Sequence, residues 1–238
     1  MKKFSKKKLV LLSISIVIFC VAVILGYHAV DNSLTEEDIH YIQIYLSSVE
    51  SLPEDTSYRE ELDYFISVQQ SVLNIAPNND EIPPGQKREP KDLYEAKTGW
   101  SFDKSRVIEK ILRYSGFETR HISIYSTEKT GSVIKSLITS EISSHAVTEV
   151  LTKKGWLVVD STAPWISTDT DNQPLSIDHI HACVKHALPI DWNTEPPIEI
   201  YLEPFVFIYG LYSRHGKFYP PYNLIPDIHY GEFIQNVL

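Results

Sequence analysis

The chain has 238 residues, of which 43% are hydrophobic and 22% charged, so it is long enough for one well-packed domain and is neither disordered nor fibrous. Five of its 22 basic residues lie in the first eight positions, which leaves 17 basic residues against 31 acidic ones in the rest of the chain. This negative balance repels nucleic acid and anionic lipid head groups, and it excludes both as partners of the main domain.

The N-terminus combines a basic tail with a long apolar run. Residues 1–8 read "MKKFSKKK", and residues 9–27 contain no charge. As a helix this run spans roughly 28 Å, close to the hydrocarbon thickness of a bilayer. A cleaved signal peptide is the alternative, but its apolar region is usually about 7–15 residues long and ends near a small-residue site that is missing here. We therefore predict a signal anchor with the lysines in the cytoplasm and the chain after residue 28 outside it.

Residues 28–90 are predicted to be mainly helical. One helix runs through "SLTEEDIHYIQIYLSSV", with Ser33 or Thr35 as its cap, and a second covers residues 58–75. A turn-rich loop with four prolines follows at residues 76–90. This part is either a helical stalk or the N-terminal part of the domain.

Residues 91–238 are predicted to form an α+β domain in which a helix packs on an antiparallel sheet. The helix begins at Ser101 and ends at Gly116, a suitable C-terminal cap. Alternating or buried apolar patterns then predict strands at 120–126, 144–151 and 155–162. Beyond residue 164 the chain is expected to be irregular, apart from one helical or strand segment near residues 176–187.

The two later strands bring a histidine and an aspartate together. If their hairpin is symmetric about Lys153 and Lys154, His145 and Asp160 become diagonal neighbours on one face, roughly 7–8 Å apart at the backbone. A carboxylate that holds one imidazole nitrogen leaves the other free to act as a general base. The alternative to a functional pair is a surface histidine and an aspartate at a strand end that do not act together.

Ser101 opens the predicted helix, where backbone N–H groups and the positive end of the helix dipole lie nearby. Such groups can form an oxyanion hole beside a nucleophile. Serine is also a good N-cap residue, and one residue can fill both roles.

Three motifs in sequence order resemble those of the transglutaminase-like superfamily, whose papain-like core carries a Cys–His–Asp triad. The matching positions span about residues 92–165: Gly99, Trp100, Asp103, Ser105, Leu112, Arg113, Gly116, Phe117, Arg120, His145, Ala146, Val147, Glu149, Val150, Gly155, Trp156 and Asp160. The resemblance implies a papain-like fold with His145 as the base, Asp160 as its orienting partner and Trp100 as a wall of the site. Ser101 stands where the family has its cysteine.

A serine changes the chemistry because a hydroxyl does not form the stored thiolate–imidazolium pair of such sites. One interpretation is a degenerate site that binds a peptide, a glycopeptide or an envelope protein without turnover. The other is a serine-dependent acyl hydrolase or acyltransferase that uses Ser101, His145 and Asp160. No cofactor or metal is expected in the site.

Three other segments offer alternatives. "DHIHACVKH" would align His179, His181 and Cys183 for zinc if it were a strand, although it lacks the usual ligand spacing. "STDTDNQP" is interpreted as a solvated acidic turn rather than a calcium loop. The aromatic C-terminal segment, which contains Arg214 and Lys217, could line a binding groove but is interpreted as sealing the domain's own core.

Overall fold

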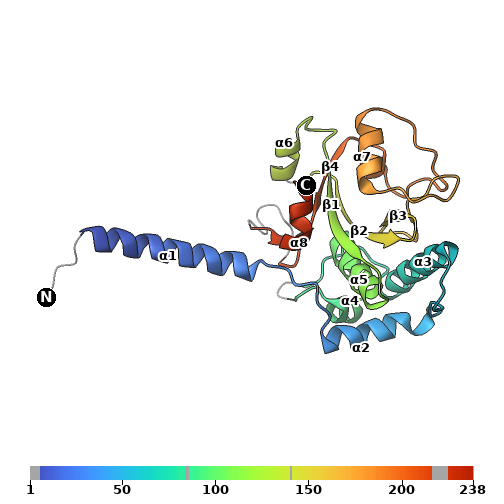
Figure 1. Cartoon of the computed structure of the whole chain (residues 1–238), viewed down its shortest axis with the longest axis horizontal. Coiled ribbons are helices and arrows are strands. Elements are labelled where there is room, and N and C mark those ends of the chain that lie inside the picture. The colour runs from blue at the N-terminus through green and yellow to red at the C-terminus, as the bar shows by residue number, and fades with distance from the viewer. Residues whose placement is uncertain (1–5, 84–85, 140, 216–224, 238) are drawn as a thin grey trace.

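The computed structural model describes residues 6–83, 86–139, 141–215 and 225–237. Helix α1 (Lys6–Tyr27) projects away from the rest of the molecule (Figure 1). Its segment Val10–Tyr27 is long and apolar enough to cross a membrane, and none of it is buried inside the protein. Most of the predicted basic tail, residues 1–5, lies outside the described residues. The helix is therefore a candidate membrane span by length and composition.

A four-stranded antiparallel sheet organises the domain, with the strand order β3-β2-β1-β4. The strands are β1 (Thr119–Ser126), β2 (Ser144–Thr152), β3 (Gly155–Val159) and β4 (Phe205–Tyr209). Two short strands, β5 (Leu211–Tyr212) and β6 (Asp227–Ile228), pair separately. Three strands agree with the predicted ones. The fourth strand, β4, corrects the prediction of an irregular chain after residue 164. The sequence did not predict it because "FVFIY" follows a proline and shows no alternation of polar and apolar residues.

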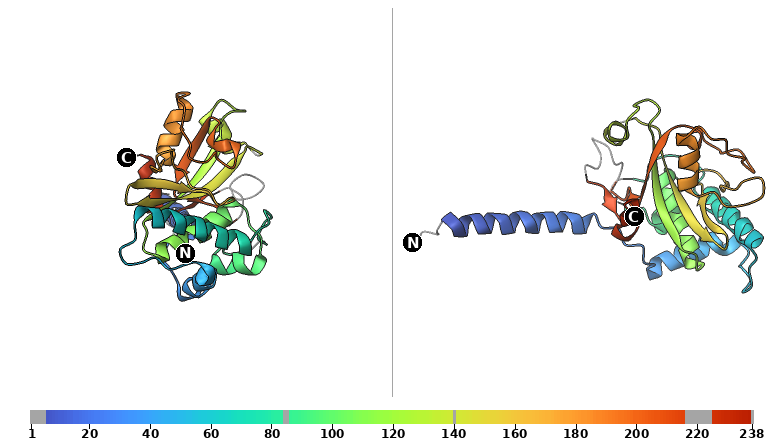
Figure 2. Two further views of the ribbon diagram at one scale, coloured as in Figure 1. Left: turned by 90° about the vertical axis from the view of Figure 1, so that its right-hand side faces the viewer. Right: turned by 45° about the horizontal axis from the view of Figure 1, so that its top comes forward.

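Helices cover both faces of this sheet (Figures 1 and 2). One face carries α2 (Glu36–Tyr45), α3 (Tyr58–Ile75), α4 (Pro90–Ala96) and α5 (Ser101–Tyr114). The other face carries α7 (Ile177–Lys185). Shorter elements are α6 (Val133–Ile138), α8 (Tyr230–Phe233) and the 3-10 turns η1 (Leu46–Ser48), η2 (Glu199–Tyr201) and η3 (Ile234–Asn236). The structure thus has the predicted α+β class, with helices packed on an antiparallel sheet.

Local signals set several helix ends as predicted. Thr35 caps α2, because its hydroxyl accepts a hydrogen bond from Asp38 N at 3.1 Å. At the end of α5, Gly116 adopts a φ of 91°. Its N–H donates to the Arg113 carbonyl, and Phe117 N donates to the Leu112 carbonyl, so the last turn is closed by a Schellman motif.

Helices α2 and α3 contribute side chains to the hydrophobic core that surrounds α5. Phe65 and Val68 of α3 are fully buried against Ile108 and Ile111 of α5 in one hydrophobic cluster. A second cluster lies between the sheet and α7 and includes Ile122 of β1. The sheet therefore separates two apolar layers, and α5 lies in the middle of the larger one.

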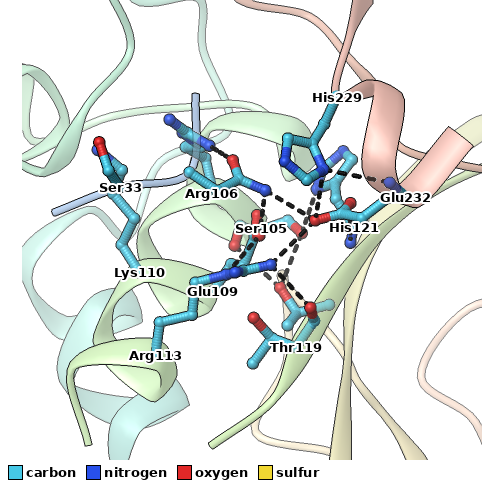
Figure 3. Close-up of polar contacts among 12 residues, drawn as sticks. Ser33, Ser105, Arg106, Glu109, Lys110, Arg113, Thr119, His121, His229 and Glu232 are labelled. Carbon is cyan, nitrogen blue, oxygen red and sulfur yellow. Dashed lines mark hydrogen bonds and ion pairs between the residues drawn. The ribbon is translucent and has the colours of Figure 1, made fainter. Parts of the chain in front are cut away.

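A buried polar network ties both ends of the domain to α5 (Figure 3). Asn32, just after α1, donates to Glu109 of α5 at 3.1 Å and to Glu232 of α8 at 2.7 Å. The Tyr212 hydroxyl contacts both carboxylates, and Arg113 pairs with both. Burial, together with the charge of Glu232, raises the pKa of Glu109. The described part of the C-terminal segment thus packs on the domain and covers its core, in agreement with the prediction. Lys217 lies outside the described residues.

Candidate functional site

The start of α5 presents Ser101 next to strand β2. Trp100 is the N-cap, and its N–H donates to Asp103 Oδ2 at 2.9 Å, so the cap is supplied by the third helical residue. Ser101 is therefore the first residue of the helix, and the N-cap role that the sequence suggested for it is wrong. Its Oγ accepts a hydrogen bond from the main-chain N–H of Ala146 at 3.2 Å.

Gly99 allows Leu93 and Asp103 to pack closely against the chain just before this helix. A Cβ atom at this position would lie 2.5 Å from Leu93 Cδ1 and 3.0 Å from Asp103 Cβ. Asp103 is itself fixed by Arg88, whose Nη1 lies 2.7 Å from its Oδ1. Burial raises the pKa of Asp103 to about 6, and the Arg88 charge opposes that rise. The helix start is consequently held by close packing and a buried ion pair.

His145 and Asp160 form a buried hydrogen-bonded pair. The β2–β3 register pairs Thr148 with Val159 and Thr152 with Gly155, which is the symmetric hairpin expected from the sequence. Just beyond this ladder, His145 Nε2 lies 2.8 Å from Asp160 Oδ2. Both side chains are almost fully buried. The contact engages Nε2, so Nδ1 is the ring nitrogen that remains for other chemistry.

The Asp160 carboxylate is held from both sides. Oδ2 also accepts the hydroxyl of Tyr201 at 2.7 Å, while Oδ1 accepts the N–H groups of Thr162 and Ala163 at 2.7 and 2.9 Å. Burial alone would raise its pKa, but the charge of His145 and these hydrogen bonds prevail and lower the pKa of Asp160 to about 2. The aspartate is thus ionised at neutral pH and oriented toward the imidazole.

Two residues that support this pair were missed by sequence reasoning. Tyr201 lies in the 3-10 turn η2, within the region expected to be irregular. Gln69 of α3 donates through Nε2 to the main-chain carbonyls of Asp160, Ala163 and Trp165, at 2.7, 3.0 and 2.7 Å. Neither residue belongs to a recognisable motif, since their contacts are made across the fold.

Lys104, three residues after Ser101 on α5, is a further buried polar residue near the site. It is 1% exposed, and its Nζ donates to Asn79 Oδ1 at 2.7 Å. Burial lowers the pKa of Lys104, although Asp103 opposes this. No sequence signal singled it out, because a lysine in the first turns of a helix is usually exposed.

A pocket of about 820 Å³ brings the predicted site residues together. Trp100, Ser101 and His145 all line it, and Asp160 lies behind His145. Within the described residues no hydrogen bond joins the Ser101 hydroxyl to the His145 ring. The remaining lining includes four charged residues, Glu128, Lys129, Glu199 and Glu203. Three carboxylates against one ammonium group give the charged side chains of the lining a negative balance.

Other motif positions build the sheet rather than the pocket. Arg120 of β1 pairs with the fully buried Glu149 of β2, with Nε 2.7 Å from Oε2. The guanidinium carbon also lies 4.2 Å from the Trp156 ring centre and 4.1 Å from that of Tyr209. The other oxygen of Glu149 accepts Ile177 N at the start of α7. These residues therefore fix α7 and the strands behind the site.

The histidine-rich segment does not form the ligand row considered for a strand. It is the helix α7, so His179 and Cys183 lie on one face, with Nε2 and Sγ 3.5 Å apart, whereas His181 packs on Phe205 and Phe207. The acidic segment is a turn as expected: Asp169 Oδ1 accepts the N–H groups of Asp171 and Gln173.

Comparison with known proteins gives a family match for the part of the chain that holds Ser101, His145 and Asp160. No curated protein and no solved structure matched the chain. The family model does match, and its range includes Ser101, His145 and Asp160. The helices packed on an antiparallel sheet are consistent with the fold of that family. Residues 53–161 thus match the transglutaminase-like superfamily, in a domain that follows a candidate membrane-spanning helix.

Proposed function

We propose that this protein is a membrane-anchored transglutaminase-like domain that binds a peptide or glycopeptide outside the cytoplasm, with Ser101 in the place of the family's cysteine. The single observation that carries the proposal is the pocket lined by both Ser101 and His145. A site of this kind without a thiol lacks the ready nucleophile of the family. Such a site can still bind a ligand through its shape, its hydrogen-bonding groups and its charge.

The state of the Ser101 hydroxyl supports binding over catalysis. Its oxygen accepts the Ala146 N–H, and it is not hydrogen-bonded to the imidazole that would have to remove its proton. A hydroxyl needs that contact during attack, since it does not ionise beforehand.

The charge of the pocket supports a ligand with a positive group. Glu128 and Glu199 are exposed at its wall, and Glu203 is held by the Ser126 hydroxyl at 3.1 Å. A peptide that carries a lysine side chain or another free amine would complement these carboxylates.

Binding can be tested with the full chain in detergent and two fluorescent peptides of equal length, one rich in lysine and one rich in glutamate. We expect saturable binding of the lysine peptide only, weakened by at least about tenfold in Glu128→Gln/Glu199→Gln. Glu195→Gln, an exposed glutamate outside the pocket lining, is the matched control. Equal binding of both peptides, or equal loss in the control, would contradict the proposal.

A second candidate function, a serine-dependent acyl hydrolase or acyltransferase, is favoured by one observation. The His145–Asp160 pair is hydrogen-bonded and buried, and its aspartate is ionised. In that reaction Ser101 Oγ would attack an acyl carbon while its proton passes to His145 and then leaves with the departing amine or alcohol. Water or an acceptor nucleophile, deprotonated by His145, would then attack the acyl-serine, and the proton would return to Ser101 Oγ.

Covalent labelling separates the two functions. A serine-directed phosphonate should leave the wild-type chain unlabelled if the site only binds. Labelling that disappears in Ser101→Ala would establish the hydrolase instead. In Ser101→Cys we expect a thiol that alkylates faster than the buried Cys183, because the helix N-terminus and His145 favour the thiolate.

The orientation in the membrane is part of the proposal. The lysine-rich tail is expected to stay in the cytoplasm. Protease added to intact cells should then degrade the domain, whereas an inverted orientation would protect it.

A further inference from the structure

Three residues distant in sequence meet where α1 joins the domain. His28 follows the last residue of α1, His215 follows β5, and Asp227 begins β6. His28 Nδ1 lies 2.9 Å and His215 Nδ1 2.6 Å from the same atom, Asp227 Oδ1. Within the described part of the chain, these residues form a group of three possible metal ligands whose ligand atoms all lie within 4.8 Å of one another.

The surroundings orient all three side chains. Asp227 Oδ2 accepts the N–H groups of Arg214 and His215 at 2.8 and 3.0 Å, which fixes the carboxylate plane. The Tyr27 ring stacks on His215 with centres 4.5 Å apart. Main-chain bonds between His28, Val30 and Ile228 hold the segment after α1 against β6. Such supporting contacts are what a preformed ligand set requires.

We propose that His28, His215 and Asp227 form a divalent-cation site that fastens the exit of the membrane helix to the C-terminal strands of the domain. Two imidazoles and one carboxylate suit Zn²⁺, which leaves a fourth position for water. The Asp227 side chain is 1% exposed and supplies negative charge, whereas that of His215 is 28% exposed and leaves a route for the ion.

The observed distances are close to those of a bound state. Ligand atoms about 2.0–2.2 Å from a tetrahedral zinc ion lie about 3.3 Å from one another. The two imidazole nitrogens are nearer to Asp227 Oδ1 than this, so each ring has to move outward by about half an ångström. Without metal each Nδ1 donates a hydrogen bond to Asp227 Oδ1. On binding, each imidazole gives up that Nδ1 proton to solvent and carries one on Nε2, so two N–metal bonds and one O–metal bond replace the two hydrogen bonds without any redox change.

Metal titration of the full chain in detergent, after treatment with a chelator, tests the site. Calorimetry with Zn²⁺ should give one ion per chain. Replacing residues that merely orient ligands costs about 10- to 100-fold in metal affinity. We therefore expect at least about a tenfold loss in His28→Gln and in His215→Gln. Glutamine keeps a side-chain N–H donor for Asp227, so metal-free thermal unfolding of these variants checks that the fold is intact.

Two controls distinguish this site from binding elsewhere. His186→Gln, at an exposed position after α7, should bind Zn²⁺ like the wild type. Cys183→Ser should do the same, and Co²⁺ in the wild type should give a tetrahedral spectrum without a sulfur-to-metal band. The proposal is overturned if no saturable binding occurs, if binding survives in both His28→Gln and His215→Gln, or if it depends on Cys183.

Discussion

Replacing Tyr201 with phenylalanine removes one hydrogen bond to the Asp160 carboxylate and leaves the buried ring in place. The pKa of Asp160 is about 2 against an ordinary value of 3.8, and one pKa unit is 1.36 kcal/mol, so its contacts stabilise the ionised folded state by about 2 kcal/mol. Hydrogen bonds to charged groups contribute about 1.5–3 kcal/mol. We expect Tyr201→Phe to lower the free energy of unfolding by about 1–2 kcal/mol at pH 7.

The effect depends on pH in a defined direction. Because the pKa of Asp160 is depressed in the folded state, its stabilisation is complete above about pH 4 and is lost as the pH falls toward about 2. The difference in unfolding free energy between wild type and Tyr201→Phe should therefore narrow across that window.

Urea unfolding of the full chain in detergent, followed by tryptophan fluorescence, measures this difference. All four tryptophans lie in the domain, and the Trp165 ring centre is 5.0 Å from that of Tyr201. Tyr41→Phe is the control, since the Tyr41 hydroxyl donates to Glu95 at 3.3 Å on the surface and should contribute less than about 0.5 kcal/mol. If both variants lose the same stability at pH 7, or if the difference persists unchanged below pH 3, the reasoning is wrong.

Three further substitutions probe the frame of the site, each by urea unfolding at pH 7. Gly99→Ala should cost about 1–3 kcal/mol, because its Cβ would press on the buried Leu93; unchanged stability would show that this turn has room. Gln69→Leu should cost about 1–3 kcal/mol by depriving three main-chain carbonyls of a donor, and a smaller loss would indicate that water replaces the amide. Arg120→Met should cost about 3–5 kcal/mol by leaving Glu149 buried without its partner, whereas a neutral result would mean that Glu149 becomes protonated.

The sequence alone determined the elements whose signals are local. An uncharged run of nineteen residues predicted α1, and glycines bounded α5 at both ends. The turn at Lys153 and Lys154 was enough to set the register of β2 and β3, and with it the face shared by His145 and Asp160. These features depend on periodicity and turn chemistry within a few residues, which a sequence displays directly.

Only the tertiary structure decided which distant residues meet. Gln69 contacts the main-chain carbonyl of Asp160 and Tyr201 contacts its carboxylate, although they lie 91 and 41 residues away along the chain. The strand β4 and the packing of α2 and α3 against α5 were equally undetermined, and α7 proved to be a helix that separates His181 from Cys183. The physical reason is that long-range contacts follow from how buried faces pack together, and many partners would satisfy the same apolar or polar pattern in one segment.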